Sequence, residues 1–195
     1  MATKKGRIFI VSAPSGSGKT TLCEKLFKTD LELDDSVSMT TRPSRPGEVN
    51  GRDYYFVSKK NFLQRIKEKG FLEWTTTYGW YYGTPKDFFE KALKKGRDIL
   101  LSIDVKGAMR VKRLHPEAVL IFIEPPSVSA LKQRLYSRNQ DGQKEIKKRL
   151  STAKKELSFA RRYDYCVIND NINSAMEKLK AIIIAERCKF QKGVV

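Results

Sequence analysis

The sequence predicts an α/β fold in which helices cover both faces of a mostly parallel sheet. Short runs rich in Ile, Val and Leu alternate along the chain with segments of helical periodicity, a pattern typical of buried parallel strands joined by helices. A glycine-rich turn joins the first apolar run to the first helical segment, and two stretches of different composition interrupt the alternation. These observations predict one α/β core with two additions.

Four apolar runs have the length and composition of buried strands. They are RIFIVSAP (7–14), RDILLSID (97–104), AVLIFIE (118–124) and DYCVIND (164–170). Four other segments repeat apolar residues at intervals of three and four, which predicts amphipathic helices. These are residues 20–28, 88–96, 129–138 and 175–190. Because helices separate the strands along the chain, we expect the strands to run parallel.

Two stretches interrupt the alternation. Residues 37–84 combine turn signals (RPSRPGEVNGRDYYF) with aromatic and Thr-rich segments, which predicts a small β-rich insertion. Residues 139–149 (NQDGQKEIKKR) interrupt a helical pattern with Asp-Gly and many charges. We therefore predict a single domain, 1–195, with a core (1–36, 85–128 and 150–195), the insertion (37–84) and a helical segment (129–149).

The composition is that of one globular domain. At 195 residues, 40% of them hydrophobic, the chain is long enough to bury a core. Purely apolar runs such as residues 118–123 and 181–185 are far shorter than the roughly 20 residues of a membrane-spanning helix, and no secretory segment follows Met1. We therefore expect a cytoplasmic protein with no membrane partner.

The cysteines and the histidine predict neither a disulfide framework nor a metal centre. Cys23, Cys166 and Cys188 are odd in number, and their spacing fits neither a disulfide scaffold nor a zinc site. His115 is the single histidine, which excludes a centre built on several histidines. We expect all three cysteines to be free thiols.

The net charge is strongly positive. The 39 Lys and Arg against 22 Asp and Glu give +17 at pH 7, and such a field attracts nucleic acids, anionic lipids and nucleotides. A charged surface also serves solubility alone. Because the sequence carries no nucleic-acid recognition motif, we expect no specific nucleic acid as a partner. The sequence predicts no oligomeric state.

The glycine-rich turn APSGSGKT (13–20) matches the phosphate-loop pattern GxxxxGK[ST], with Ala13 where Gly is commonest. A strand precedes it and a helix follows, the context in which backbone N–H groups and a helix N-terminus bind phosphates. We expect Lys19 to bridge the β- and γ-phosphates of ATP, and the Thr20 hydroxyl to bind Mg²⁺. The core is thus predicted to be a P-loop NTPase-type sheet. The expected ATP contacts of this turn are Ala13, Pro14, Ser15, Gly16, Ser17, Gly18, Lys19, Thr20 and Thr21.

A second group of polar residues predicts a site for the acceptor of the phosphate. Arg42 and Arg45 lie in a Pro-rich turn, two tyrosines follow, and Glu73, Tyr82 and Thr84 belong to a second aromatic stretch. Arginine binds phosphate bidentately, and a nearby carboxylate can read a base edge. The Asn-Lys-x-Asp signature of Ras-type GTPases is absent, which favours phosphate transfer to another molecule over a GTPase switch.

These motifs resemble those of the guanylate kinase family. The resemblance runs through IFIVSAPSGSGKTT, SMTTRPSRPGEVNGRDYYFVS, FLEWTTTYGWYYGT, LLSIDVKGAMRVK, the Arg-rich stretch 134–149 and YCVIND, and so spans nearly the whole chain. It implies that residues 37–84 bind GMP and that residues 129–149 form a lid. It also implies transfer of the γ-phosphate of ATP to GMP, giving ADP and GDP with Mg²⁺, in purine nucleotide metabolism. Because deoxyguanine presents the same base edge, dGMP is expected to be accepted.

The resemblance also implies roles for single residues. Arg42, Arg45, Tyr54 and Tyr82 match the clamp on the GMP phosphate; Ser38, Glu73, Thr84 and Asp104 match the guanine site; Asn169 matches a position near the adenine; and Lys19, Arg42, Arg134, Arg138 and Arg149 match the catalytic cations. Guanine offers two donors, N1–H and the 2-amino group, which the carboxylates of Glu73 and Asp104 would accept. A base without those donors is rejected by roughly 10⁴-fold in sites of this kind.

Three positions depart from the family pattern. Ala13 replaces the usual Gly, Ser102 stands where an acidic residue is common, and Lys106 stands where Gln is frequent. The change at Ser102 removes a candidate second carboxylate near the metal. None of the three removes a donor that phosphoryl transfer requires.

Three other functions remain open at this point. A guanylate-kinase-like module that binds phosphopeptides shares the fold, although such modules tend to have degraded phosphate loops and this one retains Lys19 and Thr20. A nucleic-acid-binding protein would account for the positive charge through salt-sensitive association. A related kinase would act on another acceptor, such as a phosphorylated sugar.

Overall fold

The computed structural model describes residues 6–137 and 143–190. Among these, five parallel strands form the central sheet in the order β2-β7-β1-β8-β9. The strands are β1 (Ile8–Ser12), β2 (Asp34–Asp35), β7 (Ile99–Ser102), β8 (Val119–Glu124) and β9 (Tyr165–Ile168). All four predicted strands are present. Strand β1 is the central strand and pairs with β7 and β8, so the segment that follows its carboxyl end lies at the middle of the sheet edge.

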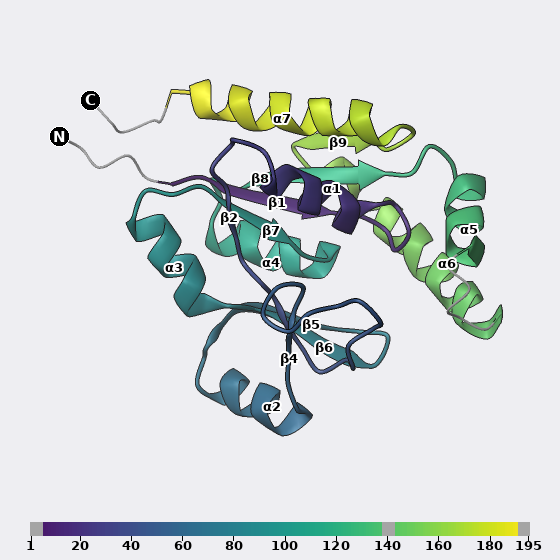
Figure 1. The fold of residues 1–195 in the computed structure, drawn as a ribbon, viewed down its shortest axis with the longest axis horizontal. Coiled ribbons are helices and arrows are strands. Elements are labelled where there is room, and N and C mark those ends of the chain that lie inside the picture. The colour runs from purple at the N-terminus through teal and green to yellow at the C-terminus, as the bar shows by residue number, and fades with distance from the viewer. Residues whose placement is uncertain (1–5, 138–142, 191–195) are drawn as a thin grey trace.

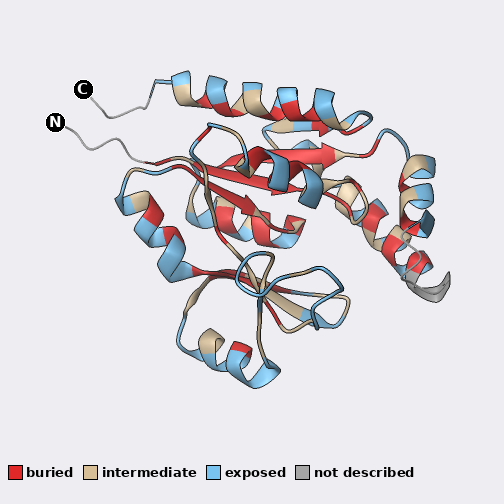
Figure 2. Ribbon diagram, viewed as in Figure 1, coloured by how far each residue is buried: buried red, intermediate tan, exposed pale blue. Residues whose placement is uncertain are grey.

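Helices cover both faces of this sheet, so the predicted fold class is confirmed (Figure 1). On one face lie α1 (Lys19–Phe27) and α7 (Ile172–Cys188), and on the other α3 (Lys86–Lys94) and α4 (Val105–Leu114). Strand β1 contributes to both cores, because Phe9 and Val11 point to the first face and Ile8 and Ile10 to the second. The buried residues in Figure 2 accordingly follow the central strands and the inward sides of the helices.

A second, four-stranded sheet is built from the inserted stretch, in the order β4-β3-β6-β5. Its strands are β3 (Met39–Thr40), β4 (Tyr55–Phe56), β5 (Phe71–Thr77) and β6 (Trp80–Pro85). The stretch also contains a helix that the sequence analysis did not anticipate, α2 (Lys59–Lys67). Ser58 caps this helix by accepting a hydrogen bond from the Asn61 N–H, and Phe62 stacks on Phe71 with ring centroids 4.5 Å apart.

Two helices lie at the carboxyl end of the central sheet, α5 (Val128–Ser137) and α6 (Gln143–Leu157), followed by the short 3₁₀ helix η1 (Ala160–Arg162) (Figure 1). The expected interruption at 139–149 is therefore wrong from residue 143 onward, where α6 begins. Ile146, Leu150 and Ala153 repeat at helical intervals and pack against Leu131 and Leu135 of α5, which stabilises a continuous α6 despite its many charges.

No helix within the described residues is long and apolar enough to cross a membrane. The three cysteines are free, with Cys23 buried and Cys166 and Cys188 exposed, as their spacing predicted.

Candidate active site

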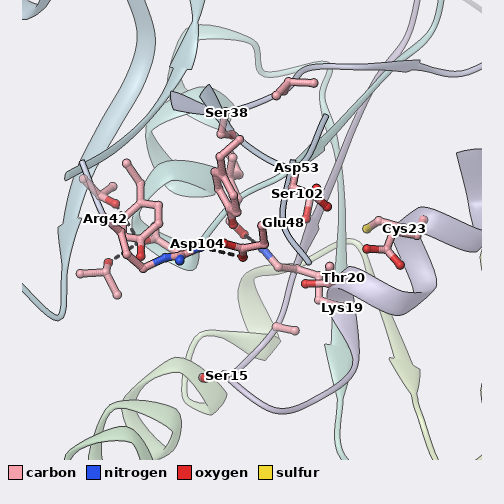
Figure 3. A pocket seen from close by; sticks show the side chains of 18 of the residues that line it. Ser15, Lys19, Thr20, Cys23, Ser38, Arg42, Glu48, Asp53, Ser102 and Asp104 are labelled. Atoms are coloured by element: carbon pink, nitrogen blue, oxygen red, sulfur yellow. Dashed lines mark hydrogen bonds and ion pairs between the residues drawn. The ribbon is translucent and has the colours of Figure 1, made fainter. Parts of the chain in front are cut away.

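A cleft of about 320 Å³ lies where the phosphate loop, the inserted sheet and α6 meet. Figure 3 shows residues of the phosphate loop, of the inserted stretch and of the segment after β7 that line it. It contains most of the residues that the sequence analysis assigned to the two nucleotides. Those lining the cleft are Ala13, Pro14, Ser15, Gly16, Gly18, Lys19, Thr20, Ser38, Arg42, Arg45, Tyr54, Glu73, Tyr82, Asp104 and Arg149. Ser17, Thr21, Thr84, Arg134 and Asn169 lie outside this lining, and Arg138 lies outside the described residues.

The phosphate loop follows β1 and leads directly into α1. Gly16 and Gly18 adopt φ of 94° and 89°, a backbone conformation that L side chains rarely adopt. Gly18 is the N-cap of α1 and has no side chain to cap the first amides, which leaves that end of the helix open to an anion. The loop therefore has the local geometry that phosphate binding needs.

The side chain of Asn169 supports the phosphate loop through a hydrogen bond. Its Nδ2 donates to the Ser17 carbonyl at 2.7 Å, and its backbone N–H donates to the Glu124 carbonyl at 2.8 Å. A Cβ at Gly18 would overlap Asn169 Nδ2, so glycine is required there for space as well as for φ. Arg134 in turn donates to the Asn169 carbonyl at 2.9 Å. Both side chains thus support the phosphate loop from outside the cleft in this structure.

Lys19 points across the loop, and its Nζ donates to the Ile103 carbonyl at 3.0 Å, just beyond β7. Burial lowers the pKa of this amine, while the thiol of Cys23 and the carboxylates of Asp104 and Glu156 raise it. Thr20 is exposed to the cleft at the start of α1. An amine and a hydroxyl therefore stand at the mouth of the phosphate loop.

The predicted phosphate clamp is assembled around a carboxylate that the sequence analysis overlooked. Glu48 accepts from Arg42 Nη2 at 2.8 Å and from the Arg45 backbone N–H at 2.7 Å (Figure 3). The Arg42 guanidinium lies 5.5 Å from the Tyr54 ring centroid, and the rings of Tyr54 and Tyr82 are 6.1 Å apart, edge to face. The signal in the sequence would have been its place in RPGE, three residues after Arg45.

The far end of the cleft carries two carboxyl groups. Glu73 is buried, and its Oε1 accepts from the Thr84 hydroxyl at 2.8 Å. Burial, together with the nearby Asp104 carboxylate, raises the pKa of Glu73 to about 7, although the hydrogen bond from Thr84 opposes this rise. Thr84 thus lies behind Glu73, away from the cleft surface, whereas Ser38 lines the cleft itself.

Asp104 joins the two sheets. As the N-cap of α4 its Oδ1 accepts from the Gly107 N–H at 2.8 Å, while its Oδ2 accepts from the hydroxyls of Thr75 at 2.8 Å and Thr77 at 2.9 Å. Both threonines lie on the same face of β5, with one residue between them, so the inserted sheet is tied to the core at the far end of the cleft. In the sequence, the run of three threonines at 75–77 was the only signal for this link between the two sheets.

Helix α6 contributes two further groups to the cleft. The Arg149 guanidinium lies 5.6 Å from the ring centroid of Tyr78, at the tip of the β5–β6 hairpin. Glu156, which the sequence analysis did not single out, is placed beside the phosphate loop. Burial raises the pKa of Glu156 to about 7, although a hydrogen bond from the Ser15 backbone and the charge of Lys19 oppose this rise.

The oxygen donors at the loop mouth suit Mg²⁺. Thr20, Ser102 and Glu156 line the cleft, and Glu156 Oε2 is buried with no hydrogen-bond partner among the described residues. The described part of the chain contains no cluster of three or more His, Cys, Asp or Glu side chains that could hold a metal ion by itself. Mg²⁺ is usually held by one or two protein oxygens together with substrate phosphates, and the oxygens of Thr20, Ser102 and Glu156 are of this kind.

Known proteins resemble the chain along nearly its whole length. A model of the guanylate kinase family matches residues 5–186. The guanylate kinase of Caldanaerobacter subterraneus subsp. tengcongensis is 46% identical over 190 residues, which cover 97% of this chain and 92% of that protein. The guanylate kinase of Nitrosospira multiformis is 46% identical over 195 residues, covering 100% and 93%.

A solved structure agrees with these sequence matches. The crystal structure of guanylate kinase from Anaplasma phagocytophilum has a TM-score of 0.82 at 33% identity, covering 97% of this chain and 92% of that one. Its likeness extends over the central sheet and the additions alike, because so little of either chain is left out. The chain therefore belongs to the guanylate kinase family, and it is an enzyme of the kinase class.

Proposed function

We propose that this enzyme transfers the γ-phosphate of ATP to GMP or dGMP, giving ADP and GDP or dGDP. The observation that carries the proposal is that one cleft contains a phosphate loop, a pair of arginines and two carboxyl groups, of which Glu73 is buried and Asp104 half-buried. The loop suits the phosphates of ATP, the arginines suit a monophosphate, and the carboxyls suit the donor edge of guanine. An acceptor that satisfies the last two sites is a guanine nucleotide.

The carboxyl pair supports selectivity for guanine. Glu73 and Asp104 offer acceptors to the N1–H and 2-amino donors, whereas adenine has neither donor and would leave a desolvated carboxylate unpaired. Deoxyguanine presents the same donor edge as guanine, which supports the acceptance of dGMP. A phosphorylated sugar would satisfy Arg42 and Arg45 but not the two carboxyls, and this disfavours it as the acceptor.

The chemistry needs positioning and charge neutralisation rather than a covalent intermediate. The phosphate of GMP, held by Arg42, Arg45, Tyr54 and Tyr82, attacks the γ-phosphorus in line. Lys19 moves from the Ile103 carbonyl to the β- and γ-phosphates, which offer it a stronger, charged acceptor.

Arg149 reaches the cleft directly, and we propose that Arg134 and Arg138 join it when residues 129–149 close over ATP as a lid. Such closure would exclude water as a competing acceptor. Asn169 would stabilise the phosphate loop through its hydrogen bond to Ser17 and would lie next to the adenine of ATP.

Mg²⁺ is the cofactor we propose, held by Thr20 and by the phosphates of ATP. When bound, it would neutralise charge that develops on the transferred phosphoryl group. Because both substrates belong to the nucleotide pool, we place the reaction in purine nucleotide metabolism, in the cytoplasm. We propose no specific nucleic acid and no membrane as partners.

A coupled ADP-release assay with ATP and Mg²⁺ tests the function, comparing GMP, dGMP, AMP, UMP and CMP. We expect fast turnover with GMP and dGMP and little with the others. Glu73→Gln should lose turnover with GMP by at least roughly tenfold, while the matched control Glu90→Gln, an exposed carboxyl on α3, should not. Absence of turnover with every monophosphate would contradict the proposal and would favour the phosphopeptide-binding module.

A further inference from the structure

Gly107 lies in the first turn of α4, between the carboxyl groups of Glu73 and Asp104 at the far end of the cleft. Its N–H donates to Asp104 Oδ1 at 2.8 Å. On its other side, a Cβ at this position would lie 2.5 Å from Glu73 Oε2 and 2.9 Å from Glu73 Cδ. The residue is therefore in contact with both groups that the proposed function assigns to guanine.

The Glu73 carboxyl has little freedom to yield to such a Cβ. The residue is 6% exposed, and its Oε1 is held by the Thr84 hydroxyl at 2.8 Å. A contact as short as 2.5 Å lies far inside van der Waals separation, so the carboxyl would have to move. Movement would break the bond to Thr84 or turn Oε2 away from the cleft.

The helix itself gives no reason for glycine here. Gly107 has a negative φ, which any residue adopts, and glycine costs about 1 kcal/mol relative to alanine inside a helix. Alanine would strengthen α4 and would retain the N–H that Asp104 needs. The close approach of Glu73 is what the absent side chain permits.

We propose that Gly107 is a specificity-determining residue of the GMP site, because its missing Cβ provides the space in which the Glu73 carboxyl is held toward the base. The proposal rests on the proposed function, since Glu73 must be the reader of guanine. It predicts that Gly107→Ala weakens GMP binding by roughly tenfold or more, the usual effect of losing a hydrogen bond to a charged group. ATP binding, at the other end of the cleft, should change by less than about twofold.

Calorimetric titration with GMP and, separately, with ATP tests this on the full chain. The variants are Gly107→Ala, Glu73→Ala and the double variant, with Arg113→Ala as the control on the exposed side of the same helix. In the Glu73→Ala background no carboxyl remains to be displaced, so adding Gly107→Ala should weaken GMP binding less than about twofold further. A melting curve of each variant separates loss of binding from loss of fold.

If Gly107→Ala alone does not fold, Gly107→Ala with Glu73→Asp replaces it, because the shorter side chain withdraws the carboxyl from the new Cβ. That pair should bind GMP more tightly than Gly107→Ala with Glu73→Ala. Unchanged GMP affinity in Gly107→Ala, equal losses for GMP and ATP, or additive losses in the double variant would each overturn the role of Gly107. Wild-type protein that binds ATP but not GMP would instead overturn the proposed function, and this inference with it.

Discussion

The Glu73 carboxyl illustrates, at the residue scale, how burial sets the chemistry of the cleft. Burial raises its pKa to about 7, so near neutral pH the free protein holds this group as a mixture of acid and carboxylate. In the proposed function guanine presents donors to this group and would bind best to the carboxylate. Binding of GMP should therefore drive the group to ionise and release a proton below pH 7.

We expect GMP affinity to increase from pH 6 to pH 8, by up to roughly tenfold, with most of the rise below pH 7 and a plateau above pH 8. Calorimetry in two buffers of different ionisation enthalpy would count the protons released. Glu73→Gln has no proton to lose at this position and should show only the titration of the GMP phosphate. The same pH profile in both proteins would mean that Glu73 does not read the base.

At the scale of elements, β5 joins the inserted sheet to the core through Asp104. Thr75 and Thr77 donate to the same carboxylate oxygen, at 2.8 and 2.9 Å. Replacing Thr75 by Val keeps its shape and removes one donor from a charged acceptor, which should cost about 1 to 3 kcal/mol of stability and raise the KM for GMP. Chemical denaturation and steady-state kinetics would measure the two effects.

Thr76→Val is the matched control for that experiment, because Thr76 lies between the two threonines on the exposed face of β5. It should change stability by less than about 0.5 kcal/mol and leave the KM for GMP as it is. If Thr75→Val and Thr76→Val behave alike, then Asp104 is positioned by other contacts.

The phosphate loop depends on an element distant in sequence, the segment after β9. Asn169→Ala removes the bond from Nδ2 to the Ser17 carbonyl, at 2.7 Å, and should raise the KM for ATP by roughly tenfold with little change in the KM for GMP. Asn173→Ala, at an exposed position in the first turn of α7, is the control. Equal changes in both KM values would indicate general loosening of the core instead.

For the whole molecule, three carboxyl groups around one cleft have raised pKa values, at about 7 for Glu73 and Glu156 and about 6 for Asp35, in each case with burial as the main cause. When the pKa of a carboxyl group is higher in the folded than in the unfolded protein, its protonation stabilises the folded state. This contribution is complete at pH values below the pKa of the group in the unfolded protein. That contribution is lost as the pH rises through 6 to 7. At neutral pH, where substrates are expected to bind, these three groups therefore contribute least to the stability of the ligand-free protein.

We expect the melting temperature of the ligand-free protein to fall between pH 5 and pH 8, after most exposed carboxyls have already ionised. Differential scanning calorimetry across this range would measure the fall. The double variant Glu73→Gln with Glu156→Gln should show a clearly smaller fall. A melting temperature that instead rises over this range in the wild type would contradict the raised pKa values.

Much of the fold followed from local pattern. The four apolar strands, the helices at 20–28, 88–96 and 175–190, and the phosphate loop are each specified within a short stretch, so the sequence predicted them. Helix α2 and the length of α6 did not follow, because their amphipathic faces are formed by few apolar residues among many charges. Both helices are stabilised by contacts with other elements. Helix α2 packs on Phe71 of β5, and α6 packs on Leu135 of α5.

The sequence by itself determined the fold class, the family and the identity of about half of the residues that line the cleft, because motifs of contiguous residues carry that information. Only the tertiary structure decided which groups meet. It set Glu48 between two arginines, Asn169 beneath the phosphate loop, and Gly107 against Glu73. Burial and contacts between residues far apart in the chain arise only when the sheets and helices pack, and they set both the pKa values and the free space of the site.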